Sequence, residues 1–466
     1  MNLTYLFKKS PIFIKQIMLN TKALLNYNIR YSGNFYQEFE KLNNLWYQPS
    51  NLILEYQKKE LTNFLIECFQ YSDWYKKKFE ELQIDEAKIN TDPYFVLKKL
   101  PILKKSERKK FVDKIVNKNP KRKIIGVGHT SGTSGSPTIN YVDKASVTVS
   151  FAFWKRFHYM IGFNNIHPKT VRFSGNIVIP ITSVKPPFWL YNIFEKQLYM
   201  STYHMSNENI PNYIKKLNQF KPTLLDGYPS AIYNLANYIN THKIELSFVP
   251  KAIATTSETL YDEQRIVIEK AFKCKIFNQY ASSEGSPFIT ECLKGNLHLN
   301  LDSGVFELLN ENYELAKPGE IAKLVVTSFR NYKTPLIRYD IQDSVLIPET
   351  NIICDCGCEM PIIKKIMGRE DDLLVASNGS LIGMSAYKVF KHANHIIRGQ
   401  IIQKNKTDFI LNVEVTEKFG KKDILFLENK VKESFGFNSK IKVNIVKSIP
   451  LGPNGKFKSV IREFKL

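Results

Sequence analysis

From the second quarter of the chain onward, short β-forming runs alternate with helix-forming stretches, and this alternation restricts the fold more than any other feature. The runs Asn176–Ile181, Ile253–Thr256 and Lys275–Tyr280 predict strands, and Pro229–Thr241 has the apolar spacing of a helix. Short apolar strands separated by helices are typical of an α/β protein with buried strands. Ile321–Phe329 alternates with a period of two, which predicts a half-exposed strand.

The C-terminal part of the chain has the pattern of a separate small domain. Residues 409–415 and 441–445 alternate like strands, and residues 424–435 between them have helical spacing. The chain has 466 residues, which exceeds the size at which a single hydrophobic core stops growing. We therefore predict an α/β protein with a large N-terminal domain of mixed sheets and helices, residues 1–368, and a small α+β domain, residues 369–466.

The chain is basic, with 66 Lys and Arg residues against 44 Asp and Glu residues and a formal net charge of +22. The lysines are spread along the whole chain, and the densest run, residues 118–123 (KNPKRK), lacks the interleaved aromatic residues of a single-strand binding surface. This run predicts a solvated loop, and no specific nucleic-acid partner is expected. The positive charge suits small anionic substrates such as nucleotides.

The N-terminal segment does not have the pattern of a signal peptide or a membrane span. Lys8, Lys9, Lys15 and Lys22 interrupt its apolar run, and no cleavage site follows. No stretch of about 18 apolar residues is present, so no transmembrane segment is predicted. The segment predicts an amphipathic helix that packs on the protein, with peripheral membrane contact as the weaker alternative. We predict a cytoplasmic protein. Residues 50–85 have helical spacing and predict further helices.

A glycine- and hydroxyl-rich segment, Gly126–Thr138 (GVGHTSGTSGSPT), follows an apolar pair. Glycines let the backbone approach a ligand closely, and the N–H groups of such turns can hold phosphate. The segment is not a Walker loop, because G-x-x-x-x-G-K-[ST] is absent. The alternative interpretation is a flexible linker. The high Ser and Thr content of the segment favours the phosphate loop over the linker.

Two further polar loops follow predicted strands. Asn278–Pro287 (NQYASSEGSP) contains Glu284, whose carboxylate could bind a hard cation such as Mg²⁺. Thr255–Leu260 (TTSETL) follows another strand. Ligands of α/β proteins bind at the carboxyl ends of strands, so these two loops predict one shared crevice. Either loop alone is a weak signal.

Cysteine and histidine residues form two clusters that suit zinc. ECLKGNLH contains Cys292 and His298, and CDCGCEMP contains Cys354, Cys356 and Cys358. Three thiolates and one imidazole complete a tetrahedral site with no open position, which would make the zinc structural. The alternative is free thiols in a reducing compartment.

The last three motifs are ordinary surface segments when each is taken alone: Pro335–Val345 (PLIRYDIQDSV), Gly368–Leu374 (GREDDLL) and Pro450–Ser459 (PLGPNGKFKS). In this order, and together with the two earlier loops, they resemble the adenylate-forming acyl ligases. The chain is most similar to the phenylacetate–coenzyme A ligase-like branch, and within it to capsular polysaccharide biosynthesis proteins. Three more segments share that likeness: RYSGNFYQEF (30–39), STYHMS (201–206) and LLDGYPSAI (224–232).

The resemblance implies an AMP-forming acid–thiol ligase. A carboxylic acid would attack the α-phosphorus of ATP, and a thiol, that of coenzyme A, would then take the acyl group from the adenylate. The small domain would be mobile, and the pathway would be surface or capsular polysaccharide biosynthesis. One alternative is transfer to a carrier protein, or to a sugar amine or hydroxyl. The other is a non-catalytic nucleotide-binding partner of a glycan-assembly system.

The resemblance also assigns residues. Lys456, Glu284 and Thr133 would be catalytic, with Lys456 bridging the carboxylate and the α-phosphate and Glu284 holding Mg²⁺. The nucleotide would contact Thr130, Ser131, Gly132, Thr133, Ser134, Gly135, Ser257, Glu258, Tyr280, Ser283, Asp343 and Arg369. The zinc ligands would be Cys292, His298, Cys354 and Cys356, with Cys358 as the spare. The chain departs from many relatives at Ser136, where they have lysine, and at Asp340, where they have arginine.

Overall fold

The structure is a computed structural model that describes residues 10–129, 138–369, 374–377, 381–382, 389–390, 393–452 and 457–464. Contacts within the chain divide it into two compact units. Unit 1 consists of Met1–Pro168, Tyr191–Gln197 and Phe277–Ile366, and unit 2 of Lys169–Leu190, Leu198–Ile276 and Met367–Leu466. The domain boundary at 368/369 stays a prediction.

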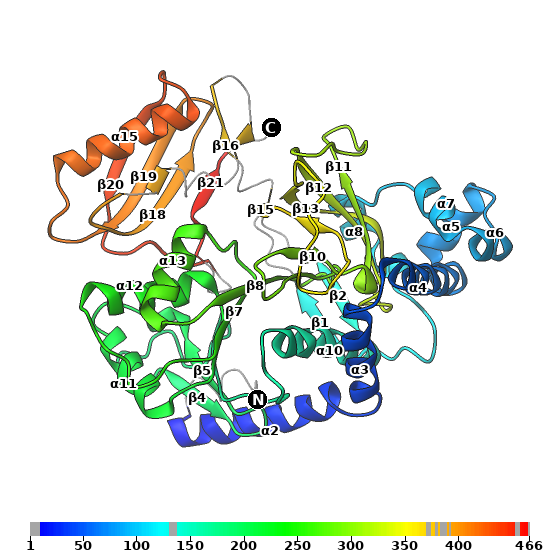
Figure 1. The fold of residues 1–466 in the computed structure, drawn as a ribbon, viewed down its shortest axis with the longest axis horizontal. Helices are drawn as coiled ribbons and strands as arrows, with labels where there is room; N and C mark the ends of the chain where they lie inside the picture. Colours follow the sequence, from blue (N-terminus) through cyan, green and yellow to red (C-terminus); the bar gives the residue numbers. More distant parts are fainter. Residues whose placement is uncertain are drawn as a thin grey trace. The chain divides into compact units, whose positions relative to one another are not determined.

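The N-terminal part of unit 1 is helical (Figure 1). Its helices are α2 (Ile12–Arg30), α3 (Phe35–Trp46), α4 (Ser50–Tyr71), α5 (Asp73–Glu81), α6 (Glu86–Thr91), α7 (Pro93–Lys99), α8 (Lys105–Lys110), α9 (Val112–Ile115) and α10 (Lys144–Met160). The helices predicted within residues 50–85 are therefore confirmed as α4 and α5. They separate at Ser72, whose hydroxyl donates to the Ile115 carbonyl over 2.9 Å.

The helix predicted near the N-terminus is confirmed as α2, but its apolar side is not the side that packs on the protein. Lys15 and Ala23 are the buried residues of α2, while Phe13, Ile17 and Leu25 are exposed. Gln16 explains the orientation, since its side chain accepts from the Tyr191 N–H over 3.0 Å and donates to the Tyr191 carbonyl. Within the described residues, no helix combines the length and apolar character needed to cross a bilayer.

The sheets of unit 1 are antiparallel. The strands β11 (Gly304–Leu309), β12 (Ile321–Ser328) and β13 (Leu336–Leu346) are neighbours, and so are β8 (Ile276–Tyr280), β9 (Ile289–Glu291), β10 (Leu297–Leu299) and β14 (Ile362–Ile363). The strand predicted at 321–329 is confirmed as β12, but its predicted half exposure is wrong, because β12 is buried from Ala322 onward. Its period of two reflects polar residues such as Lys323, whose stem is buried while its ammonium pairs with Glu311 at 2.9 Å.

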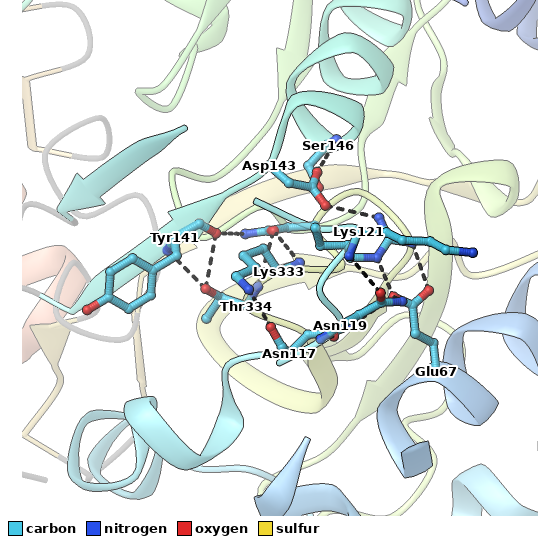
Figure 2. A network of polar contacts seen from close by, with 11 residues as sticks. Glu67, Asn117, Asn119, Lys121, Tyr141, Asp143, Ser146, Lys333 and Thr334 are labelled. Atoms are coloured by element: carbon cyan, nitrogen blue, oxygen red, sulfur yellow. Dashed lines mark hydrogen bonds and ion pairs between the residues drawn. The ribbon is translucent and has the colours of Figure 1, made fainter. Parts of the chain in front are cut away.

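A hairpin of β1 (Gly126–His129) and β2 (Ile139–Val142) encloses the predicted phosphate loop, whose residues 130–137 lie outside the described residues. Figure 2 shows the polar network beside β2. Thr334 accepts from the Tyr141 N–H at 2.9 Å, and Arg122 pairs with Glu67 and Asp143. Burial alone would lower the pKa of Arg122, but the two carboxylates raise it above its ordinary value. The run 118–123 is thus a loop, as predicted, but Arg122 within it is half-buried and ion-paired.

In unit 2, three parallel strands lie in the order β3 (Thr170–Ser174), β6 (Leu224–Gly227) and β7 (Ala252–Thr256), accompanied by α11 (Ile210–Phe220), α12 (Pro229–Thr241) and α13 (Asp262–Phe272). These elements, with β8, confirm the strands predicted at 253–256 and 275–280 and the helix at 229–241. The strand predicted at Asn176–Ile181 is wrong. The strand is β3, and Pro180 in the predicted run has no N–H to donate.

The C-terminal part of unit 2 has the predicted strand–helix–strand order. Its elements are β18 (Ile396–Gln403), β19 (Asp408–Val415), α15 (Lys421–Phe435), β20 (Lys440–Ile445) and β21 (Val460–Arg462), with the sheet order β20-β19-β18-β21. Figure 1 shows α15 lying across one face of this sheet. Phe409, Leu411, Leu427 and Val431 are buried together and fix that arrangement. The predicted α/β fold with a small α+β part is confirmed.

The remaining short strands are β4 (Trp189–Asn192), β5 (Gln197–Ser201), β15 (Lys365–Arg369), β16 (Leu374–Val375) and β17 (Leu381–Ile382), and two 3₁₀ helices are Thr202–His204 and Leu301–Ser303. Gly227, at the end of β6, is required by a close approach. Its φ is +139°, and an added Cβ would lie 1.8 Å from the Phe173 carbonyl oxygen. Any other residue there would push apart the carboxyl ends of β3 and β6.

His167 gives unit 1 a pH-dependent stability. Burial, and then the charge of Lys155, lower the pKa of His167 to about 4, so the imidazole, which contacts the rings of Tyr27 and Tyr31, is neutral. An unfolded histidine has a pKa of about 6.5, so unfolding takes up a proton between these values. We expect stability to be fully present above about pH 6.5 and to fall as the pH drops toward about 4.

Thermal melting at about pH 7.5 and about pH 5.5 measures this effect. Between these two conditions the melting temperature of His167→Gln should drop less than that of the wild type, by about 1–2 °C. The expected difference is small because solvent screens the charge at a half-buried site. His242→Gln, at an exposed histidine, is the matched control and should leave the drop unchanged. Equal drops in wild type and His167→Gln would contradict the assignment.

Candidate functional site

Tyr280 and Asp343 form one half of the predicted nucleotide site in unit 1. The Tyr280 hydroxyl, at the end of β8, donates to Asp343 Oδ2 on β13 over 2.6 Å. Burial, followed by the charge of Asp343, raises the pKa of Tyr280 well above its ordinary value, so the phenol stays protonated. The carboxylate of Asp343 is therefore held in place and remains an acceptor, as a ribose-binding group must be.

Glu284 is held in the loop that follows β8. Its side chain is 3% exposed, and the Tyr339 hydroxyl donates to its Oε1 over 3.0 Å. Asn140 on β2 donates its side-chain amide to the Ser283 carbonyl at 3.2 Å, which ties this loop to the hairpin that encloses residues 130–137. The structure thus brings Glu284, Ser283 and the hairpin together in unit 1.

Arg108 on α8 is a buried cation beside this loop that the sequence interpretation did not include. Its side chain donates to Asn140 Oδ1 at 3.1 Å and to the Ile139 carbonyl at 3.3 Å, and its guanidinium lies 5.5 Å from the ring centroid of Tyr339. Its Nε and NH1 are buried without a hydrogen-bond partner in the part of the chain that the structure describes. Among the described residues these contacts are all to neutral groups, so the charge of Arg108 is left for an anion.

Ser257 and Glu258 belong to unit 2, at the end of β7. Ser257 has a left-handed backbone with φ +72°, a conformation concentrated at functional turns. Glu258 accepts from the Ser230 N–H at 3.1 Å at the start of α12 and from the Phe457 N–H at 3.3 Å. Phe457 is the residue that follows Lys456 in the chain, so the predicted adenine loop binds the C-terminal segment.

Several predicted site residues cannot be placed. Thr130, Ser131, Gly132, Thr133, Ser134, Gly135 and Lys456 lie outside the described residues. Arg369 is the last residue of β15, and its side chain also lies outside them. The roles predicted for these residues stay predictions.

Asp340, where many relatives have arginine, is held within unit 1. It accepts from the Tyr313 hydroxyl at 2.6 Å, and Lys104 lies 3.8 Å away. The Lys104 ammonium in turn lies 3.4 Å from the Tyr313 ring centroid. The carboxylate therefore completes a local contact between α8 and β13.

The structure brings the four predicted zinc ligands together. The ligand atoms of Cys292, His298, Cys354 and Cys356 all lie within 4.8 Å of one another. The sulfurs of Cys292 and Cys354 are 3.6 Å apart, and Cys356 Sγ is 3.4 Å from His298 Nε2. Zinc–sulfur bonds of about 2.3 Å in a tetrahedron place sulfurs roughly 3.8 Å apart, so this donor set fits zinc. Cys358 lies outside the set.

The surroundings of the cluster orient its ligands. Met360 supplies a carbonyl 2.9 Å from His298 Nδ1, which places the proton on Nδ1 and leaves Nε2 as the donor atom. Burial lowers the pKa of His298, which keeps the ring neutral. Burial would raise the pKa of Cys354, but hydrogen bonds, first that of the Asn296 amide at 3.1 Å, lower it. A neutral imidazole and a thiolate are the forms that bind a metal, whereas burial raises the pKa of the other two thiols, Cys292 and Cys356.

Solved structures define the class of the fold. The crystal structure of 2-hydroxyisobutyryl-CoA ligase in the postadenylation state with 2-HIB-AMP has a TM-score of 0.68 at 17% identity, covering 90% of this chain and 91% of that one. The same ligase with 2-HIB-AMP and CoA in the thioesterification state has a TM-score of 0.56 at 18% identity, covering 90% and 92%. The anthranilate CoA ligase AuaEII with anthranoyl-AMP has a TM-score of 0.51 at 13% identity, covering 72% and 65%. The chain has the fold of the adenylate-forming acyl-CoA ligases.

Sequence comparison identifies the family within that fold. The chain is 34% identical to Protein CapK of Staphylococcus aureus over 466 residues, covering 99% of this chain and all of that protein. Residues 374–463 match the CapK C-terminal domain. The chain belongs to the CapK family, which confirms the resemblance seen in its motifs.

Proposed function

We propose that the protein activates a carboxylic acid with ATP to an acyl-adenylate and then transfers the acyl group to a thiol, that of coenzyme A. The observation that carries this proposal is the pair of contacts at the end of β8, Tyr280 with Asp343 and Glu284 with Tyr339. They hold two carboxylates in fixed positions on the fold of the acyl-CoA ligases. Acid–thiol ligation of the AMP-forming type is the chemistry that needs both.

Each carboxylate has a distinct role in the proposed reaction. Asp343 accepts hydrogen bonds from the ribose hydroxyls, and Tyr280 packs against the adenine. Glu284 would hold Mg²⁺, which binds proteins through one or two carboxylates together with substrate phosphates. When bound, the ion would supply positive charge against the phosphates. The chain's own part is positioning, which dominates when two anions must meet.

Arg108 supplies a cation that the phosphate loop lacks. Ser136 stands where many relatives have lysine, so the loop offers only backbone amides and hydroxyls. Arg108 donates to Ile139 and Asn140, directly beyond the loop, and its Nε and NH1 have no partner among the residues that the structure describes. We assign these N–H groups to the departing pyrophosphate, since guanidinium matches phosphate geometry.

Lys456 completes the adenylation site in the same proposal. The Phe457 N–H donates to Glu258 in the loop that also contains Ser257, both assigned to the adenine. This contact supports a position for the C-terminal segment beside the loop of unit 2 that is proposed to contact the adenine. An ammonium group on a long stem suits a bridge between the carboxylate and the α-phosphate.

The zinc proposed for Cys292, His298, Cys354 and Cys356 is structural. Its four protein ligands leave no position for substrate, so it orders the chain without chemistry. The cluster packs against Trp46 and Met360 in unit 1. All six cysteines are unpaired, which together with ATP and coenzyme A supports a cytoplasmic location.

The biological setting is proposed from the family. Membership of the CapK family supports a step in surface or capsular polysaccharide biosynthesis. That setting also favours a second acceptor, a carrier-protein thiol or a sugar amine or hydroxyl. Adding coenzyme A, a carrier protein or an amino sugar to preformed adenylate and identifying the acyl product distinguishes them.

A pyrophosphate-release screen tests the proposed function. Purified protein with ATP and Mg²⁺ is incubated with aryl, aliphatic, hydroxy and amino acids in turn. We expect pyrophosphate and AMP to appear in equal amounts with at least one class of acid. ATP binding without acid-dependent pyrophosphate release from any class would favour the non-catalytic alternative instead.

The role of Arg108 gives a separate prediction. Arg108→Met should raise the KM for ATP by about tenfold, the cost of a lost hydrogen bond to a charged group. Arg108→Lys keeps the charge and should lose less. Steady-state pyrophosphate release, with circular dichroism to verify folding, measures both. A folded Met variant with the wild-type KM for ATP would remove Arg108 from the site.

A further inference from the structure

The outward side of α2 is apolar. Phe13, Ile17, Leu24 and Leu25 are 64%, 61%, 43% and 62% exposed, while the opposite side contains the buried Ala23. This reverses the usual arrangement of a helix on a protein surface, in which apolar residues face inward. Several large exposed apolar side chains on one helix, here together with the exposed polar residues Thr21 and Asn28, are a feature of interaction sites.

Polar contacts prevent α2 from rolling its apolar side inward. Gln16 binds the backbone N–H and carbonyl of Tyr191, and Asn20 binds the carbonyl of Tyr191 and the N–H of Ile193, at 3.1 and 3.0 Å. Arg30 closes the end of the helix on both carboxylate oxygens of Glu195, at 3.1 and 3.0 Å. Burial would raise the pKa of Glu195, but Arg30, followed by the Tyr31 hydroxyl, lowers it, so this contact is ionic. The outward orientation is therefore built into unit 1.

The adjacent turn extends the surface. Ile193, held by Asn20, is 55% exposed, and Lys196 in the same turn is exposed. We define the α2 surface as Phe13, Ile17, Leu24, Leu25 and Ile193, with Lys22 and Lys196 as its exposed cations. Lipid-binding helices that lie in the plane of a membrane likewise combine exposed apolar residues with exposed cations.

The positive charge of the N-terminal segment indicates which kind of partner the α2 surface binds. Residues 1–34 contain no Asp or Glu, and the first acidic residue is Glu38. Pairing this surface with a second copy would bring like charges together, which is unfavourable. An anionic bilayer provides the opposite charge and an apolar layer at once.

We propose that the α2 surface docks the protein on an anionic lipid bilayer, with α2 lying in the plane of the interface. Phe13, Ile17, Leu24 and Leu25 enter the boundary between head groups and acyl chains, and Lys22 and Lys196 contact anionic head groups. This binding does not depend on the proposed ligase activity.

Co-sedimentation of the full chain with vesicles tests the proposal. Vesicles of phosphatidylcholine with phosphatidylglycerol should bind the protein, more weakly as salt rises, and vesicles of phosphatidylcholine alone should bind it far less. The double variant Ile17→Glu with Leu25→Glu should reduce binding by at least about tenfold. Lys22→Gln should reduce it by about fivefold.

Leu315→Glu is the matched control, because Leu315 is a 79% exposed apolar residue elsewhere in unit 1. It should bind vesicles like the wild type, and all variants should keep the wild-type melting temperature, since the changed side chains are exposed. Equal vesicle binding by the double variant and the wild type would overturn the proposal. So would light scattering that shows a wild-type dimer, a monomeric double variant and no vesicle binding, which would assign the surface to a second copy.

Discussion

Glu284→Gln is expected to reduce acid-dependent pyrophosphate release by about 10²–10³-fold in kcat/KM while leaving the fold intact. The glutamine has the same shape, and its amide oxygen can still accept from the Tyr339 hydroxyl, which now donates over 3.0 Å. The substitution therefore removes the negative charge and little else. A charge that holds Mg²⁺ on the reacting phosphates acts on the transition state, so kcat should fall more than the affinity for ATP.

The buried position of Glu284 makes this effect large. In a site shielded from water, each interaction between charges is stronger than at the surface, and water cannot replace an interaction that is lost. Raising the Mg²⁺ concentration should recover part of the activity of Glu284→Gln, because weaker metal binding is the proposed cause. A purely structural defect would not respond to Mg²⁺.

Glu291→Gln is the matched control for Glu284→Gln. Glu291 is another buried carboxylate of unit 1, on β9, and accepts from the Asn278 N–H over 2.7 Å. Its replacement should lower the melting temperature at least as much but leave pyrophosphate release within about threefold of the wild type. Similar losses of activity in both variants would mean that Glu284 acts through stability rather than through metal binding.

Much of the fold could be predicted from local sequence patterns. Pro229–Thr241 was predicted as a helix with the bounds of α12, since Pro229 suits the first helical turn and the apolar spacing continues to its end. The strands at 253–256 and 275–280 and the C-terminal strand–helix–strand order also follow from periodicity. The metal cluster could be predicted because its ligands come in two short segments with recognisable spacing.

Features that depend on distant partners could not be predicted in this way. Arg108 has the local pattern of any basic helix residue, and only its contacts with Asn140 and Tyr339, far along the chain, identify it. The periodicity of α2 shows that its apolar residues share one side, but not that Gln16 and Asn20 turn the other side to the protein. A helical wheel places long polar side chains opposite the apolar side of this helix. That signal could have indicated the outward orientation of the apolar side.

Cys356→Ala is expected to release the proposed zinc and destabilise the protein by at least about 3 kcal/mol, near the upper end for single substitutions. Its sulfur lies 3.4 Å from His298 Nε2, and the other two thiols complete the set. Zinc bound by four protein ligands contributes its binding free energy to folding, and three ligands bind it far more weakly. Elemental analysis should give one zinc per wild-type chain and almost none in Cys356→Ala.

Cys358→Ala is the matched control, because Cys358 is buried in the same cluster but lies outside the ligand set. It should keep its zinc and lose only the packing of one sulfur, about 1 kcal/mol. Chelation of the wild type should lower its melting temperature to that of Cys356→Ala and should not change Cys356→Ala further. Wild-type protein without zinc, with a melting temperature unaffected by chelator, would reduce the four residues to a cluster of free thiols around a histidine. In that case the order of this part of unit 1 would rest on apolar packing, against Trp46, Ile53, Met160 and Met360.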